Sequence, residues 1–271
     1  MPRIKQKYSS LEDFLASVEL TVDGELDDGG GAHFAVKGRE LEATILFCDI
    51  SGFSKRTKAL SSTETLAFVN NFFTWISTES LRNVPCIVDK YIGDEIMVIF
   101  AQEFGSSDPF AEAIQVARWM VQNDHHAFCP HIGIASGLVT IGYVGTPLRY
   151  NCSAFGAPVT LAARCASVKP ANDATANSWI TFPASEWEGR ELNTLFPPRV
   201  DPRPDGSRHI RDQTWTIGEA QSVKMKNLGN VDVRIALNHM RNIPSQSAVD
   251  RARDGVSDLK KANRYWPSGR S

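Results

Sequence analysis

The chain has 271 residues, of which 42% are hydrophobic and 22% are charged, the composition of an ordinary folded globular protein. Its formal net charge of −2 gives no basic field, so neither nucleic acid nor an anionic membrane surface is an expected partner. Because no apolar run approaches the roughly 18 residues of a membrane span, and the cysteines form no C-x-x-C pair, we expect a cytoplasmic protein with free thiols.

Residues 1–38 are expected to form an N-terminal extension that ends in a linker. Leu11–Leu20 has the spacing of a short amphipathic helix, and the glycine-rich segment Asp27–Gly31 predicts a flexible connection. The main domain then follows over residues 39–240.

The first half of this domain predicts a strand, a helix and a hairpin. Ala43–Cys48 is a short apolar strand, and Ser61 with Glu64 forms a capping box that begins a helix. Cys86–Lys90 and Glu95–Phe100 are typical of two strands joined in a hairpin.

The second half predicts a helix, a second hairpin and a further helix. Asp108–Pro109 caps a helix and places proline in its first turn. His131–Ala135 and Leu138–Val144 predict a second hairpin around Ser136–Gly137, and Pro158 opens a further helix. This order of elements indicates an α+β fold in which helices pack on a mostly antiparallel sheet.

The C-terminal third has weaker patterns. Pro197–Ser207 is rich in proline and charge, which predicts a loop, whereas Ser222–Leu237 contains the alternation of a strand. Residues 241–271 are polar, and we expect them to form a mobile tail.

Two aspartates at strand ends are the main chemical signal. Asp49 follows the apolar strand, and Asp94 lies in the turn of the first predicted hairpin. Divalent hard cations are usually held by one or two carboxylates together with substrate phosphates. Two such ions can stabilise the attacking and leaving oxygens of an in-line displacement at phosphorus.

Three segments in the same order resemble the class III nucleotidyl cyclases: Asp49–Phe53, Lys90–Glu95 and Phe155–Arg164. The resemblance extends from about Glu40 to Asn238, most of the chain. It implies a ferredoxin-like class III cyclase catalytic domain that converts a nucleoside triphosphate into a 3′,5′-cyclic nucleotide and pyrophosphate.

The resemblance implies a metal site with two Mn²⁺ or Mg²⁺ ions. Asp49 and Asp94 would bind both ions, and the backbone carbonyl of Ile50 would assist. In the turn that follows, Gly52 and Phe53 suit backbone N–H groups aimed at phosphate oxygens, because glycine lets the chain approach closely.

It also implies a set of substrate contacts. Arg164 would touch the α-phosphate and stabilise charge in the transition state. Thr160 stands where the family usually has the asparagine that orients the ribose. Lys226 resembles the family's late lysine on the triphosphate, although Lys224 is an equally placed alternative.

Lys90 and Ser153 occupy the positions that read the base in the family. Serine here is a smaller version of the usual aspartate or threonine. A lysine donor suits O2 or O4 of a pyrimidine as well as N1 of adenine, so these motifs leave the base open.

The resemblance further implies a homodimer with active sites at the subunit interface. One protomer would supply the metal aspartates, and the other the phosphate, ribose and base contacts.

Three functions are compatible with these residues. The altered Thr160, the extensions and the lack of a recognisable sensor favour a bacterial pyrimidine cyclase, making cyclic UMP or cyclic CMP for a separate effector protein in antiphage defence. The alternatives are an adenylate cyclase and an inactive cyclase fold that binds nucleotide. The two aspartates and Arg164 argue against the inactive fold.

Overall fold

The computed structural model describes residues 5–81, 83–146, 149–170, 178–198, 200–202, 208–210, 213–239 and 246–267. The strands of its main sheet are β1 Val22–Asp27, β2 His33–Ile50, β3 Ile87–Ile92, β4 Glu95–Ala101, β5 Pro130–Thr146, β6 Arg149–Phe155, β7 Trp179–Pro183, β10 Trp215–Ile217, β11 Gln221–Met225 and β12 Gly229–Asn238. A second small sheet pairs β8 Val200–Pro202 with β9 Arg208–Ile210. The helices are α1 Leu11–Ala16, α2 Phe53–Thr57, α3 Ser62–Trp75, α4 Pro109–Gln122, α5 Ala157–Ala166, α6 Leu192–Leu195 and α7 Ala248–Lys261.

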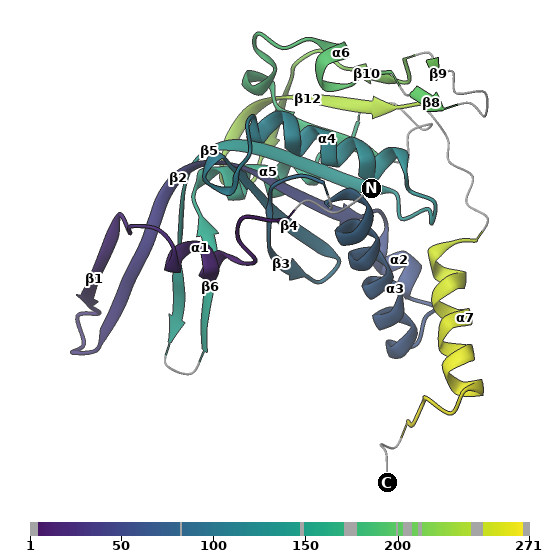
Figure 1. The fold of residues 1–271 in the computed structure, drawn as a ribbon, viewed down its shortest axis with the longest axis horizontal. Coiled ribbons are helices and arrows are strands. Elements are labelled where there is room, and N and C mark those ends of the chain that lie inside the picture. Colours follow the sequence, from purple (N-terminus) through teal and green to yellow (C-terminus); the bar gives the residue numbers. More distant parts are fainter. Residues whose placement is uncertain are drawn as a thin grey trace.

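The described part of the main sheet has ten strands, with the central order β10-β12-β7-β5-β2-β4-β3. β1 also pairs with β2, β6 with β5, and β11 with β12. Among these pairs β5 and β7 run parallel, whereas the others are antiparallel. The predicted α+β class with a mostly antiparallel sheet is therefore confirmed (Figure 1).

Both faces of the sheet are covered, because side chains alternate along its long central strand. Leu46, Cys48 and Ile50 of β2 belong to one buried cluster with α3 and α4. Ile45 and Phe47 belong to another, with α1 and α5. The end of β2, where Asp49 lies, is thus held rigidly between two helix layers.

The N-terminal segment is part of the domain, so the predicted flexible linker is wrong. Asp27–Gly31 closes a hairpin between β1 and β2, where the side chain of Asp28 accepts from the backbone N–H of Gly30. The predicted short strand consequently begins ten residues earlier, at His33 rather than Ala43. Asx turns with positive-φ glycines explain how this sequence turns tightly instead of staying open.

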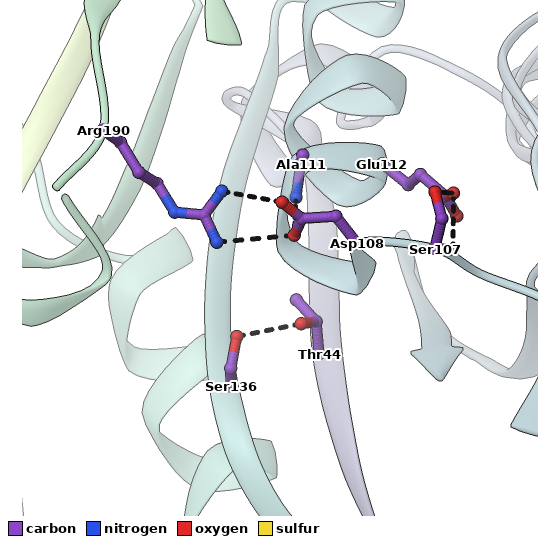
Figure 2. Close-up of polar contacts among 7 residues, drawn as sticks. All are labelled: Thr44, Ser107, Asp108, Ala111, Glu112, Ser136 and Arg190. Atoms are coloured by element: carbon purple, nitrogen blue, oxygen red, sulfur yellow. Dashed lines mark hydrogen bonds and ion pairs between the residues drawn. The ribbon is translucent and has the colours of Figure 1, made fainter. Parts of the chain in front are cut away.

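The second predicted hairpin is also wrong, because β5 passes straight through Ser136–Gly137. β5 pairs continuously with β2, and its own hairpin is made with β6. Ser136 is bonded within the sheet, its hydroxyl 2.8 Å from that of Thr44 (Figure 2). A Cβ on Gly137 would lie 3.1 Å from Pro158, so this glycine permits close packing of α5 rather than a turn.

Three further elements differ in extent: the predicted helix from Leu11 ends at Ala16, the predicted loop contains β8, and Ser222–Leu237 is divided between the paired strands β11 and β12. The first hairpin and the helix caps agree with the structure. The β3–β4 hairpin turns at Gly93–Asp94, and Ser61 caps α3 in a capping box with Glu64. Asp108 caps α4 and also binds Arg190 through both carboxylate oxygens (Figure 2).

The polar tail contains α7, a packed helix, so the expectation of a mobile extension does not hold for residues 248–261. Ala248, Ala252 and Val256 are buried, and α7 lies beside α3 (Figure 1). The backbone N–H of Ala248 donates to the carbonyl of His126 at 2.9 Å. Residues 241–245 and 268–271 of the tail, and residues 199 and 203–207 of the predicted proline-rich loop, lie outside the described residues.

Candidate active site

The two predicted metal aspartates meet in one open pocket of about 510 Å³. β2 and β4 are neighbours, with Cys48 paired to Ile96, so the end of β2 lies against the start of β4 and the turn before it. Asp49 and Asp94 therefore line the same cavity, together with Glu95. Asp49 and Asp94 are 45 positions apart in the sequence, and the pairing of β2 with β4 brings them together.

The carboxylates in this pocket disfavour one another's charge. Burial, followed by a hydrogen bond and charge repulsion from Asp94 and by the charge of Glu95, raises the pKa of Asp49 to about 8. Burial, followed by the charge of Asp94, also raises the pKa of Glu95. A divalent cation would reverse this penalty, since it interacts best with ionised oxygens.

The donor set fits such ions when substrate is present. Two carboxylates and the Ile50 carbonyl are hard oxygen ligands. Among the described residues no three His, Cys, Asp or Glu side chains converge as a complete metal site. Ions held here would therefore take their remaining ligands from water and substrate phosphates.

Gly52 and Phe53 lie on the rim of this pocket, at the start of α2. Gly52 has φ 64°, in the left-handed region, and no side chain caps the helix that follows. A Cβ added to Gly52 would meet nothing within 4 Å, so the space above the turn is open. The Phe53 ring packs on Phe68, with the ring centroids 6.2 Å apart.

Lys90 and Ser153 are brought together on a different part of the domain. Lys90 Nζ donates to the hydroxyl of Ser153, which joins β3 to β6. Sequence reasoning missed the third member, Asp89, whose carboxylate accepts from the Ser153 hydroxyl at 2.8 Å and lies 3.4 Å from Lys90 Nζ. The Asp89 side chain is fully buried, whereas Lys90 keeps 31% of its side-chain surface exposed.

A β-bulge explains why Asp89 escaped the sequence analysis. The register of β3 against β4 shifts between Val88 and Lys90, so the alternation of inward and outward positions fails there. Burial raises the pKa of Asp89, and its contacts with Ser153 and Lys90 lower it in part. Within the described residues one oxygen of this carboxylate is hydrogen-bonded and the other, Oδ1, has no hydrogen-bond partner, so the charge of Asp89 is compensated only in part.

Arg164 and Thr160 lie one turn apart on α5 and do not line the metal pocket of their own protomer. Thr160 is exposed, and the partly buried Arg164 has an Nε atom without a hydrogen-bond partner in the described part of the chain. Lys226 is exposed in the turn between β11 and β12, and Lys224 is exposed on β11. The predicted residues thus form separate groups within one chain.

Comparison with known proteins identifies the family of the central region. The model of the adenylate and guanylate cyclase catalytic domain matches residues 36–174. An adenylate cyclase from Anabaena cylindrica is 30% identical over 133 residues, 45% of this chain and 26% of its own length. An uncharacterised protein of Mycobacterium tuberculosis is 26% identical over 212 residues, 71% of this chain and 36% of its own length.

Solved structures share the fold. The adenylyl cyclase CyaB from P. aeruginosa matches with a TM-score of 0.55 at 18% identity, over 76% of this chain and 98% of that one. The guanylate cyclase domain of RhGC from Catenaria anguillulae, solved with GTP, matches with a TM-score of 0.54 at 16% identity, over 74% of this chain and 100% of that one. Within the described residues, no helix has the length and apolar character required to cross a bilayer.

Proposed function

Since the chain belongs to the adenylate and guanylate cyclase catalytic domain family, we propose that it converts a nucleoside triphosphate into a 3′,5′-cyclic nucleotide and pyrophosphate. The observation that carries this proposal is the shared pocket of Asp49 and Asp94, in which the pKa of Asp49 is about 8. A half-buried pair of carboxylates close together destabilises a fold unless a cation or proton joins it.

The residues of this pocket have distinct tasks in the proposed reaction. Asp49, Asp94 and the Ile50 carbonyl would hold two Mn²⁺ or Mg²⁺ ions. When bound, these ions would neutralise phosphate charge and lower the pKa of the ribose 3′-hydroxyl. Gly52 and Phe53 would position phosphate oxygens through backbone N–H groups, since the turn above them is open.

The remaining contacts would come from a second copy of the chain. Arg164, Thr160 and Lys226 lie outside the metal pocket of their own protomer, which supports a homodimeric site. Arg164 would stabilise charge on the α-phosphate, and its unpartnered Nε is consistent with a ligand-binding task. Thr160 would contact the ribose and Lys226 the triphosphate.

For the base, we propose a pyrimidine, with UTP preferred over CTP. The paired Lys90 and Ser153 present one donor and one short side chain, and the exposed Tyr91 and Tyr150 supply bulk nearby in sequence. The product would then be a second messenger read by a separate effector protein in antiphage defence. ATP is the second candidate, favoured by the likeness to the Anabaena adenylate cyclase.

The test is to incubate purified protein with each of the four nucleoside triphosphates and Mn²⁺, and to identify cyclic products by mass. We expect cyclic UMP to form fastest and Asp94→Asn protein to form none. If ATP gives the fastest turnover, the pyrimidine assignment is wrong and the adenylate cyclase assignment replaces it. If no triphosphate is cyclised, the proposed activity itself is wrong.

A further inference from the structure

The contact between Lys90 and Ser153 depends on a third residue, the buried Asp89. Three side chains form a chain of hydrogen bonds: the Lys90 ammonium donates to the Ser153 hydroxyl, and this hydroxyl donates to the Asp89 carboxylate. Ser153 is 1% exposed and the Asp89 side chain is fully buried. Only Lys90 reaches solvent.

The direction of these bonds fixes which group faces a ligand. A serine hydroxyl has one proton and two lone pairs, whereas an ionised carboxylate can only accept. The proton of Ser153 is directed to Asp89 at 2.8 Å, and the alternative acceptor, the Ala154 carbonyl, is farther away at 3.5 Å. Since the buried Ser153 accepts from Lys90, the group presented to a ligand is the Lys90 ammonium, which provides only N–H donors.

We propose that Asp89 is a specificity-determining positioning residue, which holds the Ser153 hydroxyl as an acceptor for Lys90 and so fixes the Lys90 ammonium as the donor that reads the edge of a nucleobase. A base that meets this donor must present an acceptor in one orientation. Asp89 itself touches no ligand in this arrangement and acts through Ser153 and Lys90. The proposal rests on the proposed cyclase function and extends it to a residue beyond the base-reading pair.

A neutral amide in place of Asp89 would remove this constraint. In an Asp89→Asn variant the side-chain NH₂ can donate to Ser153, so that the hydroxyl is no longer held as an acceptor for Lys90. The direction of the Lys90 donor would then no longer be fixed. Loss of one well-made bond to the correct base corresponds to roughly tenfold in discrimination.

The experiment compares kcat and KM of the intact protein for all four nucleoside triphosphates in wild type, Asp89→Asn, Ser153→Ala and Ser153→Thr. Asp89→Asn should raise KM for the best substrate and reduce its advantage in kcat/KM over the next base about tenfold. Its kcat should stay within about threefold, because the metal pocket and Arg164 are unchanged. Ser153→Ala should behave like Asp89→Asn, and Ser153→Thr should keep the wild-type preference.

Two control variants separate this role from a structural one. Asp124 is also buried, but its carboxylate accepts only from the backbone N–H groups of His126, Phe128 and Cys129. Asp124→Asn should lower the Tm without changing the order or ratio of bases. Ser136→Ala removes a hydroxyl bonded to Thr44 on neighbouring strands, and should also leave the ratio unchanged (Figure 2).

An unchanged base ratio in a folded Asp89→Asn protein would overturn the proposal. If Asp89→Asn does not fold, Ser153→Ala is compared with Ser153→Thr. Equal ratios of kcat/KM between bases in these two variants would contradict the proposal. If wild type cyclises nothing, the proposed function fails separately. Calorimetric Kd values for the four triphosphates then test Asp89, with the same tenfold loss of preference expected.

Discussion

The β3–β4 hairpin carries two carboxylates that the fold treats in opposite ways. Asp94 shares its pocket with Asp49 and Glu95, and the charges of these groups oppose one another. Asp89, five positions earlier, is enclosed and is met by Ser153 and Lys90. Asp89 is therefore compensated in part by neighbouring side chains, whereas the carboxylates of the open pocket have one another as neighbours, the arrangement that we propose for a cation site.

The largest effect is expected when the carboxylate charge of Asp49 or Asp94 is removed from the open pocket. Asp49→Asn or Asp94→Asn should reduce turnover by at least about a thousandfold, because a neutral amide does not replace a carboxylate that holds divalent ions. The measurement is the yield of cyclic product by mass, with Mn²⁺ and saturating triphosphate. Asp23→Asn, on exposed β1, is the matched control and should keep full activity. Near wild-type turnover in either pocket variant contradicts the metal assignment.

A second experiment asks whether the groups that are separate in one chain meet between two chains. Asp94→Asn protein mixed with Arg164→Ala protein should recover activity that neither shows alone. Random exchange makes half of the dimers hybrid, and each hybrid contains one site without either defect, so recovery approaches roughly a quarter of wild type. Demonstrated subunit exchange without recovered product would refute the shared site.

The third prediction replaces Asp49 or Asp89 with asparagine and expects the free energy of unfolding to change in opposite directions. In metal-free protein at pH 8, Asp49→Asn should raise the free energy of unfolding by less than about 1 kcal/mol, since it removes repulsion in a partly open pocket. Asp89→Asn should lower the free energy of unfolding by about 1–3 kcal/mol, since it weakens buried bonds to Ser153 and Lys90. Urea denaturation in EDTA measures both. If both variants change the free energy of unfolding in the same direction, the two sites do not differ in how their carboxylate charge is compensated.

The convergence of Asp49 and Asp94 on one pocket was predictable because its signals are local. Asp49 ends an apolar strand and Asp94 lies in a two-residue hairpin turn, and one strand pairing then brings them together. The capping residues Ser61 and Asp108 act within a single turn and were predicted for the same reason. Their identity alone indicates where a helix begins.

The errors arose where tertiary contacts override a local signal. Ser136–Gly137 has the composition of a turn, but the long pairing of β5 with β2 and the approach of Pro158 keep the chain extended. Asp89 was missed because a bulge changes which face it occupies. α7 was missed because its buried face consists mainly of two alanines, which need the surface of α3 to become a packed helix.

The smallest expected effect is a pH dependence that belongs to the metal pocket. The pKa of Asp49 is about 8 in the folded protein and 3.8 without its surroundings, so the folded state binds more protons between these values. Stability of the metal-free protein should therefore fall as pH rises from about 4 to 8. Asp49 is partly open to solvent, so we expect less than about 1 kcal/mol, or roughly 2–4 °C in Tm for a chain of this size.

Thermal unfolding across this pH range, in EDTA and in Mn²⁺, measures the effect. The proposed Mn²⁺ site requires ionised carboxylates, so the Tm increase given by Mn²⁺ should be larger at pH 8 than at pH 5. Asp49→Asn should flatten the EDTA profile in this window, whereas Asp89→Asn should retain the downward slope from Asp49. If Tm falls equally with pH in the wild type and in Asp49→Asn, the proton that is lost in this pH range belongs to another group. That outcome would remove the contrast between the open pocket and the enclosed Asp89.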